Sequence, residues 1–325
     1  MTSLVHAPRN AAGVLSEAVT MRCQDGYVLH GHLWRPDRGC GPLRGTVIVN
    51  PATGVLARYY HAYAAFLAGQ GFLVLTYDYR GVGASRPTTL KGCGIRWRHW
   101  GERDLDAVIR WVHGRRAGPI MTVGHSIGGF LLGFAESAGH VDRVLTVGAQ
   151  FAYRRDYAAR HRLRMTAKWH LVMPLLTSIV GYFPGRRLGW LEDLPAGVAY
   201  EWSLRRARME ASYPPRDRAT ILARFAAVRA PILAVGTTDD EFGTPSAIRR
   251  ALAYYTASPR IQVQLTPAAV GATGVGHFGL FHARRSGTFW IDTVRWLRDG
   301  TNPWPDAAIA VDRPRTGPDQ RPGAL

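Results

Sequence analysis

Residues 120–129 constrain the fold of this chain more than any other stretch, because an apolar run there meets a turn bounded by glycines. The sequence Ile-Met-Thr-Val-Gly-His-Ser-Ile-Gly-Gly predicts a buried strand, a tight turn with Ser126 at its tip, and a helix over 127–137. Gly124 and Gly128 are required at such a turn because side chains there would strike the neighbouring strand and helix. The G-x-S-x-G pattern therefore makes Ser126 the candidate nucleophile.

Short apolar runs alternate with runs of helical periodicity along most of the chain. The predicted strands are 17–23, 27–34, 46–50, 72–78, 120–125, 143–148, 231–236 and 261–265, and the predicted helices are 59–70, 100–115, 127–137, 245–255 and 287–298. Strands separated by helices form parallel sheets that are covered on both faces. The expected fold class is therefore α/β, with a mostly parallel sheet whose loops at the carboxyl ends of the strands hold the reactive groups.

The spacing of these runs predicts one domain with an insertion. At 325 residues and 46% hydrophobic content the chain can bury one large core. We expect residues 1–150 and 219–299 to form the two parts of that core. Residues 151–218 are too long for an ordinary connection and are predicted to form a helical cap. Residues 300–325, rich in Pro, Asp and Arg, are predicted to be a disordered tail.

The predicted cap is basic and contains a marked apolar run. It carries thirteen basic residues and six acidic ones, a net charge of +7, and the apolar run spans residues 171–183. Pro174 interrupts this run, which is too short to span a bilayer. Three interpretations remain open: a lid that lines an acyl pocket, weak contact with a membrane surface, and a helix that only packs on the core.

Composition excludes several classes of protein. The net charge of +18 comes almost entirely from arginines spread along the chain, with Lys91 and Lys168 the only lysines, so we expect a solvated basic surface and no nucleic-acid partner. Residues 1–10 lack the apolar core of a secretory signal, which predicts a cytoplasmic protein. The cysteines, Cys23, Cys40 and Cys93, are odd in number and scattered, so the sequence suggests neither disulfides nor a zinc site.

A serine nucleophile needs a histidine that takes its proton and a carboxylate that orients the histidine. In the chain order serine, acid, histidine, both partners follow Ser126. The candidate histidine is then His277, which lies in the loop before the last helix, between Gly276 and Gly279. The acid follows strand 231–236, where Asp239 and Asp240 are adjacent. Asp239 is preferred as the acid, with Asp240 as the alternative, because Asp240 is better placed to cap the following helix.

Attack on a carbonyl also needs two backbone N–H donors for the oxygen that becomes negative. The first is expected at Ile127, directly after the nucleophile. The second is expected in the loop after strand 46–50, at Thr53 or Gly54.

Several motifs together resemble the predicted α/β-hydrolases related to serine aminopeptidases and monoacylglycerol lipases. They are Pro51-Ala-Thr-Gly-Val55, Tyr60, Tyr77-Asp-Tyr-Arg-Gly-Val-Gly-Ala-Ser85, Trp100 with Asp104, Gly124-His-Ser-Ile-Gly-Gly129, Leu194-Pro-Ala-Gly-Val198 with Trp202, and Gly276-His-Phe-Gly279. The resemblance implies an eight-stranded α/β-hydrolase fold, no metal, no organic cofactor, and a triad of Ser126, Asp239 and His277. The chain departs from the family pattern in the acid loop. A proline about four residues after the acid is usual there, whereas Pro245 is six residues after Asp239.

These observations predict a serine hydrolase that cleaves a small-molecule ester with a moderately apolar acyl group. An acyltransferase with the same triad would have the same residues, because hydrolysis and transfer differ in how the cap admits water. A binding protein without activity on the same fold is the third alternative. The sequence leaves the oligomeric state and the natural substrate open.

Overall fold

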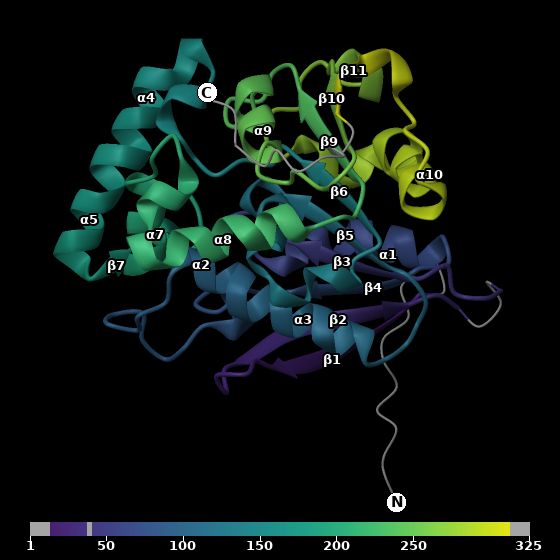
Figure 1. Ribbon diagram of the computed structural model, residues 1–325, viewed down its shortest axis with the longest axis horizontal. Helices are drawn as coiled ribbons and strands as arrows, with labels where there is room; N and C mark the ends of the chain where they lie inside the picture. Colours follow the sequence, from purple (N-terminus) through teal and green to yellow (C-terminus); the bar gives the residue numbers. More distant parts are fainter. Residues whose placement is uncertain (1–13, 38–40, 313–325) are drawn as a thin grey trace, which may run out of the picture.

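The computed structural model describes residues 14–37 and 41–312, and its centre is a mostly parallel sheet of nine strands (Figure 1). The strand order is β1-β2-β4-β3-β5-β6-β9-β10-β11. Neighbours from β4 to β10 are parallel, whereas β1, β2 and β11 pair antiparallel. The bounds are β1 Leu15–Arg22, β2 Val28–Arg35, β3 Thr46–Asn50, β4 Leu73–Tyr77, β5 Ile120–His125, β6 Arg143–Val147, β9 Ile232–Thr237, β10 Arg260–Leu265 and β11 Ala308–Asp312. The predicted α/β class is confirmed.

Helices cover both faces of this sheet. Those on one face are α1 (His61–Gly69) and α10 (Ile291–Asp299), and those on the other include α3 (Asp106–His113), α8 (Pro215–Ala227) and α9 (Pro245–Leu252). Alternate residues of the central strands supply the two cores: Val47 and Val49 of β3 pack on the side of α1, and Ile48 on the side of α3. Burial on both faces explains why these strands are continuous apolar runs.

Residues 308–312 correct two predictions. They form β11, which pairs with β10 and places Val311 opposite Ile261, so the sheet has nine strands and not eight, and this part of the tail is ordered. Trp304 anchors the segment by stacking on Phe289, with ring centroids 5.4 Å apart. The composition of residues 300–325 hid a short alternating strand. Residues 313–325, residues 1–13 and Cys40 lie outside the described residues.

The helix predicted over 127–137 is wrong. The chain instead makes three short 3-10 turns, at Ser126–Gly129, Leu131–Phe134 and Glu136–His140. Glycine lowers helix propensity, and Gly133 has a second role. A Cβ at Gly133 would lie 2.2 Å from the ring of Phe225, so α8 packs directly on the backbone of this segment.

Residues 151–218, which we call the cap segment, follow β6 and precede β9 in the chain. They lie beside the sheet (Figure 1). Its elements are α4 (Arg162–Thr166), α5 (Met173–Val180), α6 (Gly185–Leu188), α7 (Ala196–Ser203) and a hairpin of β7 (Tyr182–Phe183) with β8 (Leu194–Pro195). The boundary predicted at residue 218 falls inside α8, whose Phe225 is fully buried in the core. Among residues 14–37 and 41–312, no helix is both long and apolar enough to cross a membrane.

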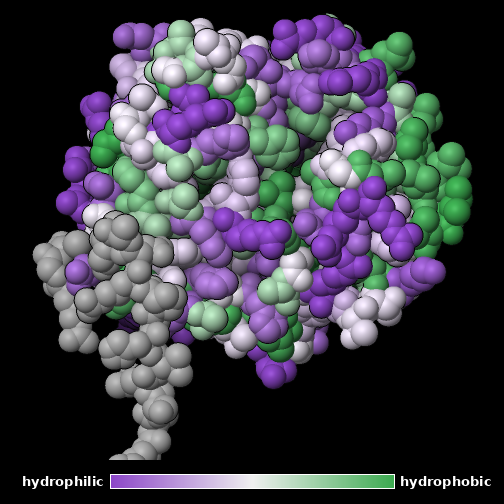
Figure 2. Space-filling model, turned by 180° about the vertical axis from the view of Figure 1, so that it is seen from behind, coloured by the Kyte–Doolittle hydropathy of each residue, from purple (hydrophilic) through white to green (hydrophobic). Residues whose placement is uncertain are grey.

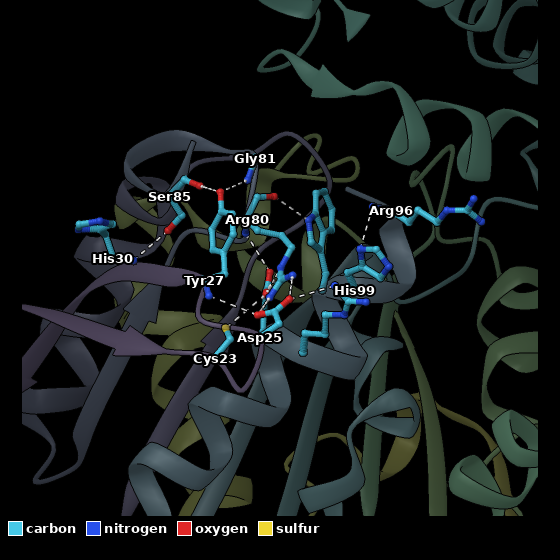
Figure 3. Close-up of polar contacts among 12 residues, drawn as sticks. Cys23, Asp25, Tyr27, His30, Arg80, Gly81, Ser85, Arg96 and His99 are labelled. Carbon is cyan, nitrogen blue, oxygen red and sulfur yellow. Dashed lines mark hydrogen bonds and ion pairs between the residues drawn. The ribbon is translucent and has the colours of Figure 1, made fainter. Parts of the chain in front are cut away.

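A buried ion-pair cluster holds the loop after β4 in place (Figure 3). Arg80 binds Asp25 through its guanidinium at 2.7 Å and donates its backbone N–H to Asp104 at 2.9 Å. Trp100 donates its indole N–H to the carbonyl of Arg80 at 3.0 Å. Cys23 lies beside Asp104, and burial raises the pKa of its thiol to about 12. The contacts of this loop therefore give a structural role to Arg80, Asp104 and Trp100. The sequence analysis named these residues only as part of a resemblance.

Candidate active site

Ser126 lies at the carboxyl end of β5 in a backbone conformation that is rare for any residue except glycine. Its φ is +54°, and its neighbours leave no room for side chains. A Cβ at Gly124 would lie 2.3 Å from the Cα of Gly129, and one at Gly128 would lie 2.3 Å from the carbonyl oxygen of Asn50. The glycines thus allow the sharp turn that brings the Ser126 side chain to a cavity.

His277 and Asp240 form a buried pair. The Nδ1 atom of His277 lies 2.8 Å from Oδ2 of Asp240, and both side chains are at most 4% exposed. The other carboxylate oxygen of Asp240 accepts the backbone N–H groups of Phe242 and Gly243, each at 2.8 Å. Burial by itself would raise the pKa of Asp240, but His277 and these two donors hold it below its ordinary value. The carboxylate is therefore charged near neutral pH, and it orients the imidazole.

Asp239 does not contact His277, and its expected pairing is wrong. Its carboxylate accepts the backbone N–H groups of Val275 and Gly276 at 2.7 and 3.0 Å. The chain turns directly after β9, where the N–H of Asp240 bonds to the carbonyl of Thr237, so the two adjacent side chains point to different places. Asp239 fixes the backbone of the histidine loop, and Asp240 reaches the ring.

Ser126 and His277 line the same cavity, which has a volume of about 250 Å³. The hydroxyl of Ser126 accepts a hydrogen bond from Nε2 of Gln150 at 3.3 Å, and none joins it to His277 in the described part of the chain. The other end of the Gln150 amide accepts the N–H of Ala152. Catalytic hydrogen bonds often form only when substrate is bound, so this arrangement is compatible with proton transfer from Ser126 to His277.

A buried histidine next to the nucleophile joins three loops of the site. His125 is enclosed, and one ring nitrogen, Nε2, lies 2.9 Å from the carbonyl oxygen of His277. A carbonyl can only accept, so Nε2 carries the proton and Nδ1 accepts the hydroxyl of Tyr60 at 2.8 Å. Tyr60 in turn accepts the N–H of Ala52 at 3.0 Å. Sequence reasoning missed His125, whose signal was only its place beside Ser126.

This network predicts a pH-dependent stability. Burial, with His277 nearby, lowers the pKa of His125 from 6.5 to about 3. Between about pH 3 and pH 6.5, His125 is therefore protonated in the unfolded chain and neutral in the folded chain. The stability that depends on the neutral ring is lost as the pH falls below about 6.5. We expect His125→Gln to destabilise the protein at pH 7.5, and this penalty to shrink by about 2 kcal/mol at pH 5.0. Urea unfolding of both proteins at the two pH values measures it, and a penalty that does not change with pH would contradict the assignment.

The loop after β3 contains Thr53 and Gly54, the two residues expected to supply the second oxyanion donor. Thr53 lines the cavity, and within the described residues its N–H donates no hydrogen bond. Its hydroxyl accepts the indole N–H of Trp97 at 3.0 Å, which fixes the residue. Gly54 does not line the cavity, and a Cβ there would lie 2.9 Å from Leu191. Of the two residues expected to supply the second donor, Thr53 lines the cavity and Gly54 does not.

The remaining walls of the cavity combine aromatic side chains with the charged residues Arg164, Lys168 and Glu241. Four tryptophans contribute: Trp97, Trp169, Trp190 and Trp202. Trp202 stacks between Trp97 and Trp169, with centroid distances of 5.9 and 4.8 Å. The ammonium of Lys168 lies over two of the rings, 4.5 Å from Trp169 and 4.1 Å from Trp190. Among the described residues, no group of three or more His, Cys, Asp or Glu side chains is placed to hold a metal ion.

Comparisons with known proteins agree with this architecture. The family model described as "Alpha/beta hydrolase family" matches residues 28–289. An esterase of Pyrococcus furiosus is similar with a TM-score of 0.57 and 14% identity, over 92% of this chain and 99% of that one. An esterase domain from Rhodothermus marinus gives a TM-score of 0.53 at 18% identity, over 87% and 98%.

A serine hydrolase of Xanthomonas campestris, described as lacking a lid, gives a TM-score of 0.50 at 16% identity, over 91% of this chain and 97% of that one. No curated protein matches the sequence closely enough to count as a relative. At these identities the solved structures establish a shared fold, while the family model covers most of the chain. The resemblance noted in the sequence is confirmed, and the chain belongs to the alpha/beta hydrolase family.

Proposed function

We propose that this protein is a serine hydrolase that cleaves a carboxylic ester through an acyl-enzyme on Ser126. The observation that carries the proposal is the buried Asp240–His277 pair, whose histidine lines one cavity with a serine held at φ +54°. A carboxylate, an imidazole and a hydroxyl at the carboxyl edge of a parallel sheet are the groups that acyl transfer needs.

In the proposed reaction, the hydroxyl oxygen of Ser126 attacks the ester carbonyl while Nε2 of His277 takes its proton. Asp240 keeps the other proton of the ring on Nδ1, so that Nε2 is free to accept, and stabilises the imidazolium that forms. The N–H groups of Ile127 and Thr53 would hold the negative oxygen of the tetrahedral intermediate. His277 then gives its proton to the departing alcohol, and water repeats the sequence to release the acid and restore Ser126.

The walls of the cavity suggest the substrate class. The tryptophans, together with Met165 and Phe242, give the cavity an apolar part, and Arg164, Lys168 and Glu241 add charged groups to its wall. A volume of about 250 Å³ accommodates an acyl chain of modest length. We therefore propose a moderately apolar acyl group, and we expect p-nitrophenyl esters from acetate to decanoate to show an optimum at intermediate length. Uniform hydrolysis at the background rate would argue against this substrate class.

Covalent labelling tests the proposed nucleophile. We expect a fluorophosphonate to form one adduct on the full chain, located at Ser126 by mass spectrometry of the digested protein, because only an activated serine attacks this reagent. Ser126→Ala should remove the adduct, while Ser178→Ala, an exposed serine of the cap segment, should not change it. If the unmodified chain gave no adduct, a binding protein on the same fold would be the better interpretation.

A further inference from the structure

One long helix of the cap segment is apolar on both of its faces. Residues 162–180, which include α4, a π-helical turn at Ala167–Val172 and α5, are continuous. Its inner face buries Met165, Trp169, Met173 and Thr177 at intervals of four residues, and Met165 and Trp169 line the cavity above Ser126. This face is accounted for by packing.

The outer face has no such partner among the described residues. Leu163, Leu171, Leu175 and Ile179 have exposed fractions of 87%, 65%, 61% and 73%. The last three follow one another at intervals of four, which places them on one side of the helix. Figure 2 shows hydrophobic residues gathered at the edge of the molecule where α4 and α5 lie. The exposed side of a helix on a globular protein is ordinarily polar, so this stripe needs an explanation.

The charged residues around the stripe are of one sign. Every charged side chain that is exposed between residues 151 and 212 is an arginine: Arg154, Arg155, Arg160, Arg162, Arg164, Arg186, Arg187, Arg206 and Arg208. The acidic residues of this stretch are buried or half-buried. Two of them, Asp156 and Asp193, are neutralised by Arg250 and Arg86 outside it, at 2.6 and 2.8 Å. Three of these arginines, Arg164, Arg186 and Arg208, pair with Glu241, Glu192 and Glu210. The other six leave the surface of the cap segment cationic as well as apolar.

We propose that the outer face of helix 162–180 docks on an anionic lipid bilayer, with Leu171, Leu175 and Ile179 entering the boundary between headgroups and acyl chains. A helix with this pairing of apolar residues and arginines gains from burial of the apolar side chains and from attraction to negative headgroups. A second copy of the chain fits less well, because a symmetric contact would bring two arginine-rich surfaces together. If the proposed function holds, docking also brings esters dissolved in the bilayer close to the cavity that the same helix covers.

Vesicle flotation of the full chain tests the docking. We expect the protein to float with vesicles of phosphatidylcholine and phosphatidylglycerol in a 7:3 ratio, to bind vesicles of phosphatidylcholine alone at least about tenfold more weakly, and to dissociate at high salt. The double variant Leu171→Asn/Leu175→Asn should reduce the partition coefficient at least about tenfold, because two leucines lose their burial. The matched control Ile309→Asn/Val311→Asn, exposed apolar residues of β11, should bind as the unmodified chain does.

A second pair of variants tests the electrostatic part. Arg160→Gln/Arg187→Gln should weaken binding by about fivefold for each charge removed. Arg229→Gln/Arg249→Gln, exposed arginines outside the cap segment, should leave it unchanged. Binding that is equal for both vesicle types, or that the leucine variant does not weaken, would overturn the proposal. So would a dimer in sedimentation velocity that Leu171→Asn/Leu175→Asn converts to a monomer.

The two proposals of this protein's role fail separately. Flotation does not depend on turnover, so Ser126→Ala should bind vesicles as the unmodified chain does. Vesicle binding without ester hydrolysis would refute the enzymatic proposal alone, and hydrolysis without vesicle binding would refute the docking alone.

Discussion

Ser126→Ala is expected to lower kcat for the best p-nitrophenyl ester by about a millionfold, and His277→Ala by a similar factor. Without the hydroxyl no acyl-enzyme can form, and without the imidazole the hydroxyl loses the base proposed to take its proton. Ser126 directly follows β5 and His277 lies in the loop after β10, and both side chains line one cavity. Their effects should therefore be those of a single unit.

The double variant Ser126→Ala/His277→Ala makes this expectation sharp. Residues that act together are not additive, so the double variant should be no slower than either single variant. Initial rates at saturating ester, with thermal unfolding to show that each variant folds, give the comparison. Losses that multiply in the double variant would mean that the two residues act independently, and they would remove the argument for proton transfer between them. Gln150→Ala serves as the control: it removes the hydrogen bond at 3.3 Å that holds the hydroxyl, and kcat should change by less than about tenfold.

The sequence predicted the strands of the core because both faces of a parallel sheet are buried, which leaves continuous apolar runs such as Thr46–Asn50. It placed Ser126 correctly at a strand end because the glycines around it have no substitute: their missing side chains are where Asn50 and Gly129 lie. It could not find β11, since Ala308–Asp312 is short and partly exposed and its pairing with β10 depends on contacts distant in sequence.

The side-chain pairings were beyond sequence reasoning for a different reason. Asp239 and Asp240 are identical in type and adjacent, and only the turn after β9 decides which carboxylate meets His277. One signal was present, because Pro245 is six residues after Asp239 but five after Asp240, closer to the spacing usual in related chains. The place of His125 beside Ser126 did not reveal its role, because that role depends on Tyr60 and on the backbone of His277, 65 and 152 residues away.

Asp240→Asn is expected to lower kcat/KM by about ten-thousandfold, whereas Asp239→Asn should change it by less than about tenfold. The difference follows from the hydrogen bonds of each carboxylate. One oxygen of Asp240 accepts the N–H groups of Phe242 and Gly243, so in the variant the amide oxygen must take that place. The NH₂ group then faces Nδ1 of His277 and donates to it, which drives the ring proton onto Nε2. In that tautomer His277 cannot accept the proton of Ser126.

The same substitution at Asp239 has a milder consequence, because the oxygen that accepts the N–H groups of Val275 and Gly276 can be replaced by an amide oxygen. The histidine loop keeps its two hydrogen bonds, and the ring keeps Asp240. Steady-state kinetics of the two variants, with fluorophosphonate labelling rates as a second readout, distinguish the adjacent residues. A slow Asp239→Asn beside a fast Asp240→Asn would mean that the 2.8 Å contact between Asp240 and His277 has no part in the reaction and that the acid must be sought in a rearranged loop.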